Sequence, residues 1–203
     1  MAYTTVQICN SALTKIGERA INSLDDDLVQ ARACKLRYAN VFDTVLSLYP
    51  FTCTLKRQNL TYDAGYTKQW EYDYQYSLPA DCLHIWEVVD SDGDRLYEFS
   101  KEGDKILSNL SSIGILYTRR ITDTGVIDHD VAELLSYYLA ADLSERLNPD
   151  VNRTNLLKQE FERFFARVRT ADARRQAPRY YGTTDPFNKD TDDHPMNWLD
   201  ARL

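Results

Sequence analysis

The sequence predicts an α+β fold: a helical bundle built from the N- and C-terminal helices, with an inserted antiparallel β region and an extended C-terminal arm. Apolar residues recur at helical spacing before residue 50 and again after residue 122. Between them, short β-type segments alternate with turn residues. After residue 175 neither period is sustained. We therefore expect bundle segments 1–50 and 122–175, a β region at 51–121 and an arm at 176–203.

Two helices are expected before residue 50. The first carries apolar residues at three- and four-residue steps from Val6 to Ile16, and Gly17 is well placed to end it. The acidic run 25–27 is expected in the first turn of the second helix, where carboxylates accept from free backbone N–H groups. Pro50 should end that helix near Tyr49.

The central part of the chain is expected to form short strands joined by turns. The candidate strands are residues 53–60, 71–78, 83–90, 96–99, 105–108 and 113–119. Asp92-Gly93 predicts a hairpin turn, since Gly readily adopts the positive φ that a tight turn needs. A calcium loop is not favoured, because Arg95 and Lys101 stand where the EF-hand pattern requires Gly and Glu.

Two more helices are expected after residue 122. Asp128 is placed to cap the first, which should end before Asn148-Pro149. The second begins near Asp150 or Asn152, and its apolar stripe is the most hydrophobic in the chain. That stripe consists of Leu157, Phe161, Phe164, Phe165 and Val168. One core is expected to contain Leu13, Phe42, Leu135 and Phe161.

The end of the last helix and the arm hold the candidate partner-binding residues. Arginines gather on the face opposite the apolar stripe: Arg163, Arg167, Arg169, Arg174 and Arg175. A solvated face explains them best, while an interface or a DNA-facing patch stays open. The arm cannot bury a core of its own, but its isolated aromatic residues could dock on another surface. The candidates are Arg174, Arg175, Tyr180, Tyr181, Phe187 and Trp198.

Length and composition limit the class of protein. A chain of 203 residues that is 43% hydrophobic can bury one core with a small satellite layer. The net charge of −7 argues against a protein that binds nucleic acid through its phosphates, and it is compatible with a surface that DNA slides past. The 14 tyrosines favour a contact-making protein. No apolar run approaches the roughly 18 residues of a membrane span, and no signal-peptide pattern begins the chain, so we expect a cytoplasmic product.

The sequence carries no recognisable catalytic or metal-binding motif. Its four cysteines are widely spaced, without a C-x-x-C pair, and are expected to be reduced packing thiols: Cys9, Cys34, Cys53 and Cys82. The three histidines lack metal-ligand spacing: His84, His129 and His194. Nucleophile-elbow and phosphate-binding loop patterns are missing as well. We therefore predict a protein that is not an enzyme and has no cofactor or metal, with an enzyme kept as a remote alternative.

Several phrases of the chain, in their order and spacing, resemble the tail tubular protein A family, the head-to-tail adaptors of short-tailed bacteriophages. They are CNSALTKIG (9–17), INSL (21–24), LSLYPF (46–51), YDYQY (72–76), LPADCL (78–83), ILSN (106–109) and ILYTR (115–119). The resemblance covers about residues 5–175 and stops before the arm.

The resemblance implies a structural virion protein. Its members form a ring, a dodecamer, that binds the portal above and the tail nozzle below, while DNA passes through the lumen without specific binding. We therefore expect the chain in the virion neck, and in the host cytoplasm during assembly. The arm's partner stays open between portal, nozzle and a neighbouring subunit. Alternatives are a head-completion or neck protein of a long-tailed phage, and a nucleic-acid-binding module that uses the arginine-rich helix with Tyr180 and Tyr181.

Overall fold

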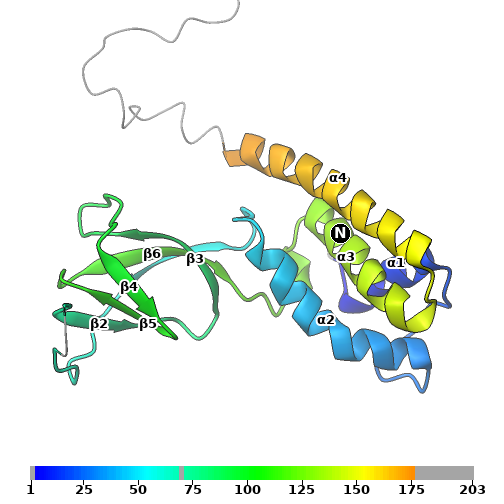
Figure 1. The fold of residues 1–203 in the computed structure, drawn as a ribbon, viewed down its shortest axis with the longest axis horizontal. Helices are drawn as coiled ribbons and strands as arrows, with labels where there is room; N and C mark the ends of the chain where they lie inside the picture. The colour runs from blue at the N-terminus through cyan, green and yellow to red at the C-terminus, as the bar shows by residue number, and fades with distance from the viewer. Residues whose placement is uncertain (1–2, 69–70, 177–203) are drawn as a thin grey trace, which may run out of the picture.

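The computed structural model describes residues 3–68 and 71–176, and within them the chain has the expected α+β architecture (Figure 1). The bundle consists of α1 (Thr5–Ile16), α2 (Val29–Ser47), α3 (His129–Leu147) and α4 (Val151–Gln176). A β region inserted between α2 and α3 lies beside one end of this bundle. The arm expected at 176–203 lies, apart from Gln176, outside the described residues.

Helix α3 is the centre of the bundle, because α1, α2 and α4 all pack against it. Its buried residues lie all around the helix rather than along one stripe: Val131, Ala132, Leu134, Leu135, Ser136, Leu139, Ala140, Ala141, Leu143 and Ser144. A helix that is apolar on every side must be enclosed by others. The core expected for the four helices is confirmed, since one buried cluster contains Leu13, Phe42, Leu135 and Phe161.

The bounds of α1 follow from its two end residues. The Thr4 hydroxyl accepts from the Gln7 N–H, and the Gln7 side chain accepts from the Thr4 N–H, which forms a capping box. Gly17 follows the helix at φ 77°, a left-handed conformation that favours glycine. The predicted stop at Gly17 is confirmed.

The acidic run at 25–27 does not lie in the first turn of α2, so that prediction is wrong. The helix begins at Val29, and Leu28 supplies no side-chain cap. The Asp26 carboxylate instead accepts from the N–H groups of Asn22 and Ser23, at 2.8 and 3.1 Å, and so closes a turn ahead of the helix. An Asp carboxylate accepts from backbone N–H groups both in turns and at the starts of helices, so the residue type alone does not distinguish a turn from a helix start.

The β region contains two three-stranded antiparallel sheets with a core of their own. One sheet has the order β1 (Leu55–Leu60), β6 (Ile113–Arg119), β3 (Cys82–Val89). The other has β2 (Tyr74–Ser77), β5 (Lys105–Ser108) and β4 (Phe99–Glu102). The core is filled by Leu60, Tyr76, Val88, Ile106, Ile113, Ile115 and Tyr117. This core is the small satellite that the length of the chain allowed.

One strand lies elsewhere than expected. Residues 96–99 were expected to form a strand, but β4 begins only at Phe99. The turn before it is the predicted one, with Gly93 at φ 89° and the Asp90 carboxylate accepting from the Asp92 and Asp94 N–H groups at 2.9 Å. After this turn the Leu96 N–H donates to the Val88 carbonyl at 2.8 Å, and regular pairing resumes only in β4.

Burial of Phe161 gives a test of the bundle core. Its ring lies 5.1 Å from that of Tyr138 and 5.8 Å from that of Phe165, and 6% of the residue is exposed. We expect Phe161→Ala to lower the free energy of unfolding by about 3–5 kcal/mol in urea denaturation, because it leaves a cavity. Leu156→Ala, on the exposed side of the same helix, should change it by less than about 0.5 kcal/mol. Equal effects would contradict the assigned core.

Tyr38 on α2 predicts a pH effect on stability. Burial raises the pKa of Tyr38 to about 12. An unfolded tyrosine loses its proton near pH 10, so between pH 10 and 12 the unfolded state releases a proton that the folded state retains. The free energy of unfolding should therefore fall across that window, and less steeply in Tyr38→Phe. Tyr62→Phe, at an exposed position, is the control. Identical slopes for the wild type and Tyr38→Phe would refute the assignment.

Candidate interaction surface on the last helix

Helix α4 carries the two described candidates, Arg174 and Arg175, in its last turn. The other four, Tyr180, Tyr181, Phe187 and Trp198, lie outside the described residues. The Asp150 carboxylate accepts from the Asn152 N–H at 2.9 Å, which accounts for the start of α4 at Val151, near the predicted position. The two described arginines lie side by side in sequence but have different surroundings.

Arg175 is used within the chain. Its guanidinium donates to Asp128 at 2.9 Å and to Asp130 at 2.7 Å, which ties the end of α4 to the start of α3. Asp128 occupies the N-cap position of α3, but its side chain makes no capping hydrogen bond there. The cap expected from the Asp128 side chain is therefore replaced by an ion pair, and Arg175 holds two helices together.

Arg174 lies at an exposed hollow on the other side of the helix end. The hollow has a volume of about 570 Å³ and is lined by Tyr49, Ala166, Arg169, Thr170, Ala173 and Arg174. The Arg169 guanidinium lies 5.6 Å from the ring centres of both Tyr49 and Phe165, within the range of cation–π contacts. Arg174 has no ion pair with any of the described residues. The hollow is therefore a basic surface, in which aromatic rings contact the Arg169 guanidinium.

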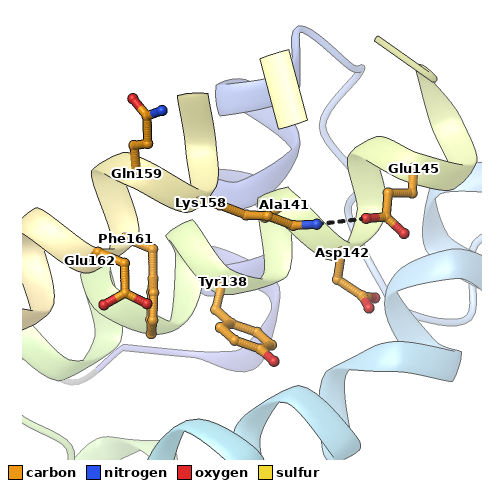
Figure 2. A pocket seen from close by; sticks show the side chains of 8 residues that line it. All are labelled: Tyr138, Ala141, Asp142, Glu145, Lys158, Gln159, Phe161 and Glu162. Atoms are coloured by element: carbon orange, nitrogen blue, oxygen red, sulfur yellow. Dashed lines mark hydrogen bonds and ion pairs between the residues drawn. The ribbon is translucent and has the colours of Figure 1, made fainter. Parts of the chain in front are cut away.

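A second concave surface lies further back along the same helix, where α3 and α4 meet (Figure 2). We call it the acidic groove. Its volume is about 490 Å³, and its lining is Tyr138, Ala141, Asp142, Glu145, Lys158, Gln159, Phe161 and Glu162. Helix α2 borders it, since Arg37 binds Asp142 through two hydrogen bonds of 2.6 and 2.7 Å. No sequence pattern indicates this groove, because it exists only where three helices meet.

The described residues contain little that suggests catalysis. No three His, Cys, Asp or Glu side chains among residues 3–68 and 71–176 are grouped so that they could hold a metal ion. No helix in that part of the chain is long and apolar enough to cross a membrane. The ring of His84 lies tilted against that of Trp86, with ring centres 4.3 Å apart, and burial lowers the pKa of His84. His129 contacts the Tyr3 hydroxyl at the start of α3.

The cysteines are packing residues, with one feature that spacing did not reveal. All four are free thiols. Cys9 and Cys34 are fully buried where α1 faces α2, and their side chains form a hydrogen bond. This bond and burial raise the pKa of Cys9. Both are free core residues, and their distance in sequence gave no sign that they meet.

Comparison of the chain with protein-family models and with curated proteins finds no match.

The contrast between the two arginines can be measured. We expect Arg175→Ala to lower the free energy of unfolding by about 1 kcal/mol at low salt and by less at high salt, because a half-exposed ion-pair network is lost. Arg174→Ala should change it by less than about 0.5 kcal/mol. Urea denaturation at two salt concentrations measures both. If Arg174→Ala lowered the free energy of unfolding more than Arg175→Ala does, Arg174 and not Arg175 would be the structural arginine.

Proposed function

We propose that this chain is a structural subunit of a head-to-tail adaptor of a short-tailed bacteriophage, of the tail tubular protein A type. Its copies form a ring, a dodecamer by resemblance, which joins the portal to the tail nozzle. DNA passes through the lumen without specific binding. In this role the protein assembles in the host cytoplasm, is found in the virion, and has neither catalytic activity nor a cofactor.

The observation that carries this proposal is where the resembling phrases fall in the fold. Three of them, at residues 9–17, 46–51 and 78–83, contain points where the chain changes direction or passes between the bundle and the β region. Gly17 ends α1 in a left-handed conformation. Phe51, directly after Pro50, is fully buried in the bundle core just before β1 begins. Pro79 accepts from the Cys82 N–H at 2.9 Å in the turn into β3. The residues that carry the resemblance therefore include ones that shape this fold.

Packing between the bundle and the β region also supports a subunit that acts as one body. The Arg120 guanidinium, just after β6, binds the Asp43 carboxylate of α2. The Thr52 N–H donates to Asp172 of α4 at 3.2 Å. Leu83 of β3 packs against the bundle core. A rigid subunit of this kind suits a ring that must bear load between two larger assemblies.

The basic hollow at Tyr49, Arg169 and Arg174 favours a second candidate, a nucleic-acid-binding module. Such a module would lose DNA affinity steeply as salt rises, because arginine–phosphate contacts release counterions. An adaptor with a net charge of −7 should show weak binding and almost no salt slope. Fluorescence anisotropy of a labelled duplex at several salt concentrations distinguishes the adaptor from the nucleic-acid-binding module.

A third candidate is the neck protein of a long-tailed phage. The genes next to this one distinguish it from an adaptor, since they encode either a short or a long tail.

If the chain is an adaptor, its copies should form rings that are visible by electron microscopy. Negative-stain images of the purified protein mixed with its portal should show a ring stacked on the portal, and images of the protein alone establish whether the ring forms unaided. The portal must come from the same genome, since the contact surfaces are specific. An unrelated portal is the control. If the protein neither forms rings nor binds its own portal, the proposal fails.

A further inference from the structure

The acidic groove has an apolar floor large enough for an aromatic side chain. Phe161 and Ala141 form the floor, each 6% exposed, and the Tyr138 ring packs edge-on against Phe161 with ring centres 5.1 Å apart. Figure 2 shows Tyr138 and Asp142 pointing from α3 toward α2, while Lys158 reaches from α4 to Glu145. A volume of about 490 Å³ is in the range of pockets that hold a ligand group.

The rim of the groove is acidic. It carries the carboxylates of Asp142, Glu145 and Glu162, against the cation of Lys158 in the lining and that of Arg37 at the border. Lys158 is already paired with Glu145 at 3.0 Å, and Asp142 with Arg37 of α2. Glu162 is exposed and has no ion pair with any residue in the described part of the chain. An occupant of matching charge would bring a cation to Glu162 and an aromatic group to the floor.

The chain itself contains a segment with this chemistry. Directly after α4 it reads Ala177-Pro178-Arg179-Tyr180-Tyr181, and no acidic residue follows until Asp185. A guanidinium is well suited to bind a carboxylate. A tyrosine can bury its ring on an apolar floor and keep its hydroxyl in water. Residues 179–181 therefore match the groove in both charge and shape.

The segment is too short to lie along the groove of its own chain. Helix α4 rises about 1.5 Å per residue, so Phe161 lies roughly 22 Å back from the helix end at Gln176. The five residues from Gln176 to Tyr181 span at most about 18 Å between Cα atoms, even when fully extended and turned back along α4. We infer that the acidic groove binds residues 179–181 of a second copy of this chain. This inference rests on the proposed ring, because arm-to-groove contacts that repeat in one direction are heterologous and form a ring when the rotation between successive copies closes.

A cross-linking experiment tests whether the contact joins two copies. The full-length variants Gln159→Cys, at the groove, and Tyr180→Cys, in the arm, are mixed and treated with a thiol oxidant. The mixture should give a covalent dimer containing one chain of each variant, which either variant alone and the wild type should not give. The double variant in one chain should give linked multimers. If the mixture gives no mixed dimer, or the double variant gives only internally linked monomer, the inference is overturned.

A charge exchange tests the chemistry of the contact. Glu162→Arg and Arg179→Glu should each weaken self-association about tenfold or more, and the two together should restore it, as sedimentation velocity measures. Glu98→Arg, the same charge change at an exposed site in the β region, is the matched control and should have no effect. Glu162→Gln replaces Glu162→Arg if the latter fails to fold. Unchanged association in the single variants, or no recovery in the double variant, overturns the inference.

The outcomes separate this inference from the proposed function. Rings on portals without the mixed cross-link would support the adaptor and reject the arm-to-groove contact. Cross-linked copies that neither form rings nor bind a portal would support the contact and reject the adaptor.

Discussion

The bundle depends on the enclosure of α3 by three other helices. Because buried residues lie on all sides of α3, the helix depends on α1, α2 and α4, which all pack against it. Its few buried polar groups are satisfied locally. The Ser136 hydroxyl donates to the Glu133 carbonyl at 2.7 Å, and the Ser144 and Thr154 hydroxyls bond at 2.9 Å. The packing of α3 therefore decides where every other helix lies.

The acidic groove is a consequence of that arrangement. Helices α2 and α4 both pack on α3, and at this surface α2 contributes Arg37, which binds Asp142. Tyr138 lies only partly buried at the groove. The buried residues Ala141 and Phe161 belong both to the bundle core and to the lining of the groove, so the apolar floor continues from the core to the surface.

The sequence predicted most of the fold because the strongest signals were local. Helical spacing, the glycine after α1 and the Asp92-Gly93 turn each act within a few residues. Besides the strand expected at 96–99, the errors concern acidic side chains. Asp26 closes a turn and Asp128 binds Arg175, although the sequence equally suited both to helix starts. The sequence shows that an acidic residue is present, but the group that its carboxylate binds depends on tertiary contacts.

The same limit applies to the candidate surface. The sequence marked Arg174 and Arg175 together, and only packing separates a structural arginine from one exposed at a basic hollow. The groove was not predictable, since its lining comes from two helices and its border from a third. The cysteine pair across α1 and α2 was hidden for the same reason, being 25 residues apart in sequence.

The end of α4 is held at two points directly before the arm begins. Asp172, only 1% exposed, accepts from the Thr52 N–H where the chain leaves the bundle for the β region. One turn later, Arg175 binds the two carboxylates at the start of α3. These contacts come from opposite ends of the inserted β region, so both crossings between bundle and β region meet at the last turns of α4. A force applied through the arm would therefore reach α3 and the β region together, instead of unwinding the end of a free helix.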